Sequence, residues 1–196
     1  MKPAKFFKRI LAFIIDTIIV TLAAALLSTP FVNVENSTEL RKELNEVAQK
    51  YIDQEIDVQT YYKQIVDLNY EIVRTEGTTS LITVLVTILY FIVFQFYNKG
   101  QTLGKKLLKI KVINASGDRL TINNIGLRAL LINTIVFDML LLFMAFVFDK
   151  NSFSYSSTII EITEYSFVIA SIIMIIVRKD GRGLHDLLGN TQVVEE

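Results

Sequence analysis

The chain has 196 residues with 20 basic and 20 acidic side chains, so its formal net charge is zero, which excludes a generally basic nucleic-acid binder. Hydrophobic residues make up 52% of it, charged residues only 20%, and the mean hydropathy is +0.43, whereas a soluble domain carries about 25% charged residues. The absence of cysteine excludes a disulfide framework, a thiolate metal site and a cysteine nucleophile. We therefore expect a protein whose first partner is the lipid bilayer, with no nucleic-acid partner.

Four apolar stretches are long enough to cross a membrane, which takes about 20 residues of helix. They cover about 10–31, 80–97, 129–148 and 157–177. Asp16 lies inside the first stretch and Asp138 inside the third, while Glu161 and Glu164 lie near the outer end of the fourth. We predict an all-α membrane protein, with 1–196 forming a single domain built on a four-helix transmembrane bundle.

The first apolar stretch follows four basic residues, as a signal peptide does. However, it is longer than the core of about 7–15 residues found in signal peptides, and it contains Asp16. We expect it to be retained as a membrane helix.

Residues 34–76 form an insertion between the first two spans. Leu40, Leu44 and Val47 recur at helical spacing, and Ser37 offers an N-cap before them. We predict one or two amphipathic helices outside the membrane, as a hairpin or cap. The insertion either packs on itself with a solvated face or covers a substrate path.

The loop after the second span divides into two parts. Residues 102–108 suit a short cytoplasmic interfacial helix, and 109–113 alternate as a strand that could form a hairpin with 119–122. Lysines on this surface would meet anionic lipid head groups, at about 1 kcal/mol each. The run 100–106 lacks the spacing of a phosphate-binding loop, because only three residues separate its glycines. We expect no nucleotide and no other cofactor.

Asp16 and Asp138 are the acidic residues buried deepest in the predicted bundle. Asp16 lies about 10 Å beyond Arg9 on the same helical face, and Asp138 lies about 15 Å beyond Arg128. A carboxylate at such depth costs at least about 2.5–3.5 kcal/mol unless it is paired, protonated or turned to the bundle interior. Asp16 either pairs with Arg9 or Arg128 and joins two helices, or takes part with Asp138 in an ion or proton site.

Three stretches of the sequence together resemble the RDD family of small integral membrane proteins, named for one arginine and two aspartates. They are Arg9 to Asp16, Gly100 to Lys105 continued by Lys111-Val112 and Leu127 to Leu130, and Gly181 to Leu188 continued by Thr191 to Val194. The insertion and Asp138 match no family feature. The resemblance implies a bacterial cytoplasmic-membrane protein, with a transport role proposed and sodium/proton exchange suggested for some members.

The resemblance marks Asp186 as the second family aspartate, with His185 beside it. We expect the two residues to form a cytoplasmic hydrogen-bonding clasp, onto Arg9 or Arg128. A hydrolytic His–Asp site would need a nucleophile and an oxyanion hole, which the motif does not supply. No cluster in the sequence has a recognisable metal-ligand spacing either. We expect neither an enzyme nor a metal site.

Two functions remain open from the sequence. The first is transport or exchange of small cations or protons through a site with buried carboxylates, with Arg9, Asp16, Arg128, Asp138, His185 and Asp186 as the candidate polar residues. A homodimer is one assembly that would lengthen the pathway, because four helices enclose little. The second is a non-transporting scaffold or accessory subunit that binds protein or lipid partners.

The distribution of charge between the spans predicts the orientation. Residues 98–128 hold seven basic side chains and one acidic one, whereas 32–79 hold five basic and ten acidic side chains. Lysine and arginine concentrate on the cytoplasmic side of membrane proteins. We expect both termini in the cytoplasm and the insertion outside.

Cysteine labelling tests this topology without interference, because the native chain has no cysteine. Glu55→Cys should react with an impermeant thiol reagent in intact cells. Labelling that appears only after the cells are permeabilised would show the opposite orientation.

Overall fold

The computed structural model describes residues 1–32 and 34–196. Three of its helical stretches are long and apolar enough to cross a membrane: 6–31, 77–97 and 150–177. Two further helices, α7 (Ile122–Ile132) and α8 (Ile135–Val147), make a fourth crossing if they count as one broken span. The prediction of an all-α membrane protein is confirmed.

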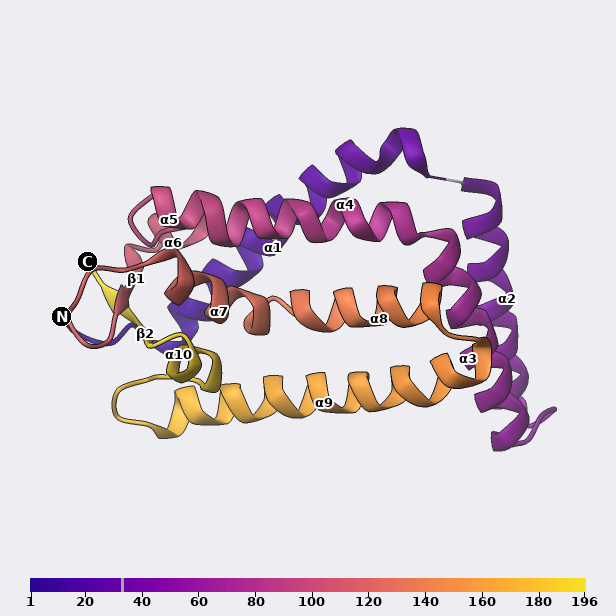
Figure 1. Ribbon diagram of the computed structural model, residues 1–196. Helices are drawn as coiled ribbons and strands as arrows, with labels where there is room; N and C mark the ends of the chain where they lie inside the picture. Colours follow the sequence, from indigo (N-terminus) through magenta and orange to yellow (C-terminus); the bar gives the residue numbers. More distant parts are fainter. Residues whose placement is uncertain (33) are drawn as a thin grey trace.

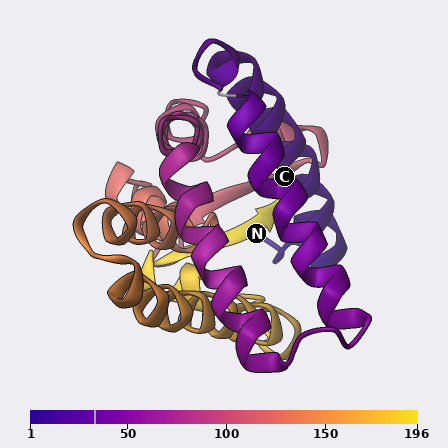
Figure 2. The same cartoon turned by 90° about the vertical axis from the view of Figure 1, so that its right-hand side faces the viewer.

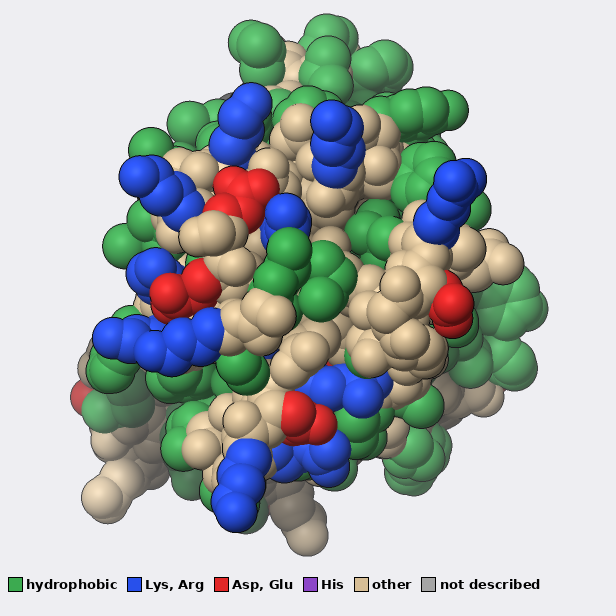
Figure 3. All heavy atoms as spheres, turned by 90° about the vertical axis from the view of Figure 1, so that its left-hand side faces the viewer, with side chains coloured by type: hydrophobic (Ala, Val, Ile, Leu, Met, Phe, Trp, Pro, Cys, Tyr) green, Lys and Arg blue, Asp and Glu red, His purple; other side chains and the backbone are tan. Residues whose placement is uncertain are grey.

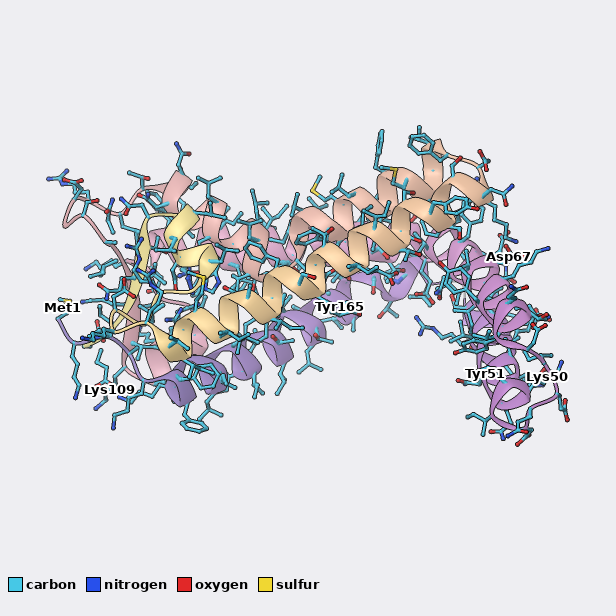
Figure 4. The ribbon with its side chains drawn as sticks, turned by 90° about the horizontal axis from the view of Figure 1, so that it is seen from below. Met1, Lys50, Tyr51, Asp67, Lys109 and Tyr165 are labelled. Atoms are coloured by element: carbon cyan, nitrogen blue, oxygen red, sulfur yellow. The ribbon has the colours of Figure 1, made fainter. Side chains whose placement is uncertain are left out.

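The bundle has two distinct ends. Both chain termini lie at one end, and a hairpin of α2 (Val34–Ile52) and α3 (Val58–Thr75) lies at the other (Figure 1). We call them the terminal end and the hairpin end. Figure 4 shows Met1 at the terminal end, Tyr51 in the hairpin and Tyr165 between them along the bundle.

The first span consists of α1 (Phe6–Ser28) and a short 3₁₀ turn, η1 (Thr29–Phe31). Its buried residues recur every four positions, at Ala12, Asp16, Val20, Ala24 and Ser28. This stripe of small side chains lets neighbouring helices approach closely, and α1 packs on α4 and α6. Large apolar side chains on its other faces stay exposed, as a lipid-facing surface requires.

The second span joins α4 (Gly77–Ile88), a π-helical stretch η2 (Leu89–Phe94) and α5 (Gln95–Tyr97). Within η2, Phe91 packs against buried residues of the first span and of α7, and Tyr90 reaches Asp16. Such π-helical turns often occur at functional sites. Here the turn lies where the second span meets two other spans.

The third span differs from the single helix predicted for 129–148. It begins earlier, with α7, because Thr121 and Asn124 form a capping box ahead of Ile122. It is also broken, because the axes of α7 and α8 differ in direction by 62°.

The break lies at Asn133 and Thr134. Thr134 has a φ of 56°, a left-handed conformation that is rare for a β-branched residue and that stops the helix. The backbone N–H and the side-chain amide of Asn133 both donate hydrogen bonds of 3.1 Å to the carbonyl of Ala129, which closes the last turn of α7.

The fourth span, α9 (Lys150–Val177), begins seven residues before the predicted start at 157. Asp149 caps it by accepting hydrogen bonds from the backbone N–H groups of Asn151 and Ser152, at 2.9 and 3.1 Å. The polar residues that follow this cap extend the helix beyond its apolar part, where α9 packs on α3 and α8.

The hairpin packs across the ends of the spans, with α2 and α3 side by side (Figure 2). Asp57 caps α3, and Arg41 of α2 forms a two-pronged ion pair with Glu76 at the start of the second span. The Tyr70 hydroxyl donates to the carbonyl of Phe148, which joins α3 to the turn between α8 and α9. The predicted amphipathic insertion is therefore a hairpin docked on the bundle.

A small sheet at the terminal end corrects the predicted hairpin of 109–113 with 119–122. Strand β1 (Ile110–Asn114) instead pairs antiparallel with β2 (Thr191–Glu195), and Pro3 forms a bridge to Val194. The alternation of 109–113 correctly predicted a strand, but the strand that pairs with it lies far along the chain. Val193 and Val194 supply the buried side chains that 119–122 lack.

Lysine and arginine side chains are spread over the surface of the terminal end, with fewer acidic side chains among them (Figure 3). The exposed members are Lys2, Lys5, Lys99, Lys106, Lys109, Arg119, Arg178 and Lys179. The positive charge thus gathers at the end that the loop charges assign to the cytoplasm.

Candidate functional site

Asp186 lies at the centre of a buried ion-pair cluster at the terminal end. Its Oδ2 accepts a hydrogen bond from Nη2 of Arg9 at 2.5 Å, and its Oδ1 accepts one from Nη1 of Arg128 at 2.7 Å. The side chain of Asp186 is fully buried, and those of the two arginines are 8% and 9% exposed. One carboxylate therefore joins the first span to the third.

The motif after the fourth span positions this carboxylate. Gly183 precedes α10 (Leu184–Leu188), and the Asp186 side chain accepts from the Gly183 backbone N–H at 3.1 Å. The Thr191 hydroxyl at the start of β2 donates to Oδ1 at 3.2 Å. Arg9 also donates to the carbonyl of Gly181. The carboxylate is thus held by its own loop and by two other helices.

Charge explains why Asp186 stays ionised in this position. Burial alone would raise the pKa of Asp186, but the positive charges of Arg128 and Arg9 outweigh it and hold the pKa below the ordinary value. A buried carboxylate with two guanidinium partners is then anionic at neutral pH.

His185 connects the same cluster to the fourth span. Its Nδ1 lies 2.5 Å from Oγ of Ser171 on α9, and its Nε2 lies 3.4 Å from Oδ2 of Asp186. Burial, with the charge of Arg128, lowers the pKa of His185 to about 3, so the ring is neutral at neutral pH. The arrangement resembles a serine–histidine–aspartate set. However, Ser171 is fully buried, and a Cβ on Gly183 would come within 2.7 Å of its hydroxyl, which leaves no room for a substrate there.

Asp16 has a separate set of partners, and neither Arg9 nor Arg128 is among them. Its carboxylate accepts hydrogen bonds from the hydroxyls of Tyr90 and Thr102, at 2.7 and 2.5 Å, and from the backbone N–H of Gly104 at 2.7 Å. These partners come from η2 and from the start of α6 (Leu103–Leu107). Asp16 therefore joins the first span to the second and to α6.

Lys105 lies between the two carboxylates. Its Nζ is 3.8 Å from Oδ2 of Asp16, and the side chain is 12% exposed. Burial, with the charge of Arg128, lowers the pKa of Lys105 to about 7. Lys105 turns inward and is not one of the lysines exposed on the surface of this segment, whereas the adjacent Lys106 is exposed.

Asp138 stands apart from these clusters. It lies in the first turn of α8, its side chain is exposed on the bundle surface, and the Thr134 hydroxyl donates to it at 3.2 Å. Its charge also interacts with that of Glu164 on α9. Of the three alternatives for a carboxylate at this depth, a position turned to the bundle interior does not apply to Asp138.

A cavity of about 180 Å³ lies beside the ion-pair cluster. Arg9, Lys105, Arg128 and His185 line one part of it, and most of the other lining residues are apolar side chains of α1, η2, β1, α7, α9 and β2. Asn133, at the break in the third span, also lines it.

Over residues 1–32 and 34–196, the structure forms no group of three or more His, Asp or Glu side chains that could hold a metal ion.

The sequence did not reveal several members of the site. Tyr90, Thr102 and Ser171 are hydroxyl residues in ordinary apolar or polar surroundings, and nothing in their spacing links them to Asp16 or His185. The only signal available was the resemblance around Thr102, which lies within the second family stretch.

The fold and this cluster define an integral membrane protein with an arginine–aspartate centre at one end of its spans. The family model that matches the chain is described as the RDD family, and it covers residues 3–190. The chain belongs to the RDD family. Comparisons with curated proteins and with solved structures gave no match.

Gly104 should be sensitive to any side chain, because a Cβ there would lie 2.4 Å from the carbonyl oxygen of Ala12 and 2.8 Å from Oδ1 of Asp16. We expect Gly104→Ala to destabilise the protein by about 1–3 kcal/mol. The matched control is Gly126→Ala, because no atom lies within 4 Å of a Cβ there; that change should be neutral or stabilising by up to about 1 kcal/mol. Thermal unfolding in detergent measures both. Equal melting temperatures would contradict the close approach of α6 to α1.

Asp186→Asn should destabilise the protein by about 3–5 kcal/mol, because it leaves two buried guanidinium groups without their shared anion. The pKa of Asp186 lies below the ordinary value of 3.8, so its stabilising effect is complete at neutral pH and is lost only in stronger acid. Asp180→Asn, which breaks a more exposed pair with Arg178, is the control and should change little. Similar melting temperatures for the two variants would contradict the central role of Asp186.

Proposed function

We propose that this RDD family protein moves small cations or protons across the membrane, with Asp138 as the residue that binds and releases a proton. The observation that carries the proposal is the break in the third span, with Asp138 in the first turn after it. A helix begins there within a membrane crossing, so backbone N–H groups without helical acceptors lie next to a carboxylate. Discontinuous helices of this kind form ion and substrate sites in many transporters.

A second carboxylate supports this position. Glu164 lies next in sequence to Tyr165, which is midway along the bundle (Figure 4). The charge of Glu164 interacts with those of Asp138 and Glu161. Neighbouring carboxylates repel each other when both are ionised, and binding a proton or a cation relieves that repulsion. Among the described residues, the charges that act on Glu164 are those of Asp138 and Glu161, which are both acidic.

The carboxylates of Asp16 and Asp186 fit exchange less well. Each already accepts at least three hydrogen bonds from protein groups, and Asp186 is balanced by two arginines. Displacing these partners would leave buried charges and hydrogen-bond donors at the terminal end without partners. We therefore propose that Asp16 and Asp186 hold the helices together, whereas Asp138 and Glu164 bind the transported ion or proton.

The exposed position of Asp138 bears on the assembly. A mid-membrane carboxylate on a lipid-facing surface is costly. A homodimer that covers this face of α8 and α9 would enclose Asp138 and Glu164 and complete the pathway.

Flux measurements in proteoliposomes test the proposal. The native protein should carry proton-coupled sodium flux, and Asp138→Asn should abolish its pH dependence while melting as the native protein does, because asparagine mimics the protonated carboxyl. Glu164→Gln should weaken the same dependence. Asp118→Asn, on an exposed turn at the terminal end, removes the same charge and should leave flux unchanged. Unchanged pH-dependent flux in Asp138→Asn would rule out the proton role.

The tip of the hairpin favours a second candidate, a non-transporting partner of another protein. Ile52 and Val58 are 69% and 62% exposed there, next to a stacked pair of tyrosines, Tyr51 and Tyr61. Folded native protein without proton, sodium or potassium flux would favour this candidate over transport.

A further inference from the structure

The cavity at the terminal end lies between the first span and the fourth span, each of which packs mainly on other elements. Phe6, Ile10 and Phe13 of α1 line one side, and Val168, Ile172 and Ile175 of α9 line the other. α1 packs on α4 and α6, while α9 packs on α3, α8 and α10. The outermost wall residues remain exposed, with Ile10 at 38% and Ile172 at 40%, so the cavity opens between the two spans on the lipid-facing side.

The polar part of the wall is cationic. Arg9, Lys105 and Arg128 contribute to it, and none of the described residues lining the cavity is an aspartate or a glutamate. Asp16 and Asp186 are bound to the same basic side chains from outside the cavity wall. With His185 neutral, three cations meet two anions in this region, which leaves one positive charge without a partner when Lys105 is protonated.

Donor groups are also free on this wall. Among the residues that the structure describes, Arg128 donates one hydrogen bond, to Asp186. That bond uses one of the five N–H donors of a guanidinium. Lys105 donates to the Thr102 hydroxyl at 3.2 Å, which uses one of the three donors of its ammonium. Both side chains are therefore able to bind an anion that enters the cavity.

We propose that this cavity binds one anionic phospholipid from the leaflet at the terminal end, with its phosphate between Lys105 and Arg128 and one acyl chain between α1 and α9. Charge and shape both point to an amphipathic anion. The phosphate would meet a wall with excess positive charge and unused donors, and the chain would meet aromatic and branched aliphatic side chains. The volume of about 180 Å³ suits a phosphate and part of a chain, so the remainder of the lipid stays in the bilayer through the opening.

The apolar wall of the cavity is long enough for part of an acyl chain. From Ile175 to Val168 the apolar wall extends about 10 Å along α9, and Phe6 to Phe13 extend equally along α1. Arg9 lies within the α1 part of this wall, and Nζ of Lys105 lies 3.8 Å from Oδ2 of Asp16, one turn beyond Phe13, so the phosphate would lie inside the cavity. A bound phosphate would also favour the charged form of Lys105, whose burial among cations otherwise disfavours it.

This site is distinct from lipid attraction by the exposed lysines around it, which is diffuse and falls off with salt. It is also independent of the ion route through Asp138. Loss of proton-coupled flux in an Asp138 variant would not affect lipid binding at this site. Loss of lipid binding in a cavity variant would not decide whether the protein transports ions, which the flux measurements test.

Native mass spectrometry of the full chain in detergent tests the proposal. The delipidated protein is offered phosphatidylglycerol or phosphatidylcholine with the same acyl chains. We expect one phosphatidylglycerol per chain, bound in preference to phosphatidylcholine. Lys105→Gln should weaken that binding about fivefold, and Lys106→Gln, the exposed neighbour, should not.

A pair of tryptophan variants tests the position of the acyl chain. Val168→Trp fills the cavity between α1 and α9 and should abolish retention of the lipid, whereas Ile169→Trp, which is 57% exposed and does not line the cavity, should retain it. Ile172→Trp at the opening is the second blocking variant if Val168→Trp fails to melt as a folded protein.

Three results would overturn the proposal. The first is equal retention of the two lipids, and the second is equal behaviour of Lys105→Gln and Lys106→Gln. The third is stabilisation by inorganic phosphate alone that matches phosphatidylglycerol and persists in the folded blocking variants, because it would identify a soluble anion as the occupant.

Discussion

The fold depends on one buried carboxylate, that of Asp186, which is shared by two arginines from different spans. An ion removed from water loses several kcal/mol of solvation, so neither guanidinium is stable at its depth without the anion. Because Arg9 lies on the first span and Arg128 on the third, the requirement for charge balance fixes the relative positions of both helices. His185 extends the constraint to the fourth span through Ser171.

Asp16 plays a parallel role for the remaining elements. Its hydrogen-bond partners come from the second span and from α6. Asp16 and Asp186, together with His185, therefore connect all four spans at the terminal end. Lys105 lies near both carboxylates, and its ion pair with Asp16, at 3.8 Å, is longer than those of the two arginines with Asp186. Burial lowers the pKa of Lys105 to about 7. Toward the middle of the bundle the third span is broken. The buried ion pairs described above therefore lie at the terminal end, away from the break in the third span.

Much of the architecture could be predicted from the sequence, because membrane spans need long apolar runs and those runs are visible. The break in the third span could not, since Asn133 and Thr134 interrupt neither length nor hydropathy, and the left-handed conformation of Thr134 depends on its surroundings. The partner of β1 was missed for a different reason: alternation marks a strand, but the nearest pairing segment is not always the one that buries the most apolar surface.

The candidate site was predictable in part. The resemblance to the RDD family singled out Asp186, and we expected it to form a clasp onto Arg9 or Arg128. The sequence also suggested Arg9 or Arg128 as the partner of Asp16, whereas the structure supplies hydroxyl and backbone donors. Lys105 and Lys106 are neighbours of the same type, and only the packing of α6 on α1 decides which one turns inward. Asp138 lies on the bundle surface in the first turn after the break, and no pattern in the sequence indicates that break.

The pairing of the chain's two ends has a consequence for biosynthesis. Arg9 and Asp186 are 177 positions apart, and β2 contacts Pro3 and Ala4 as well as β1. A nascent chain inserts its first helix long before the C-terminal segment leaves the ribosome. During that interval Arg9 has no carboxylate partner and must remain at the water interface, which holds the first helix in a shallow position. Emergence of Asp186 then completes the cluster, so the final adjustment of the first helix can occur only after Asp186 has been translated.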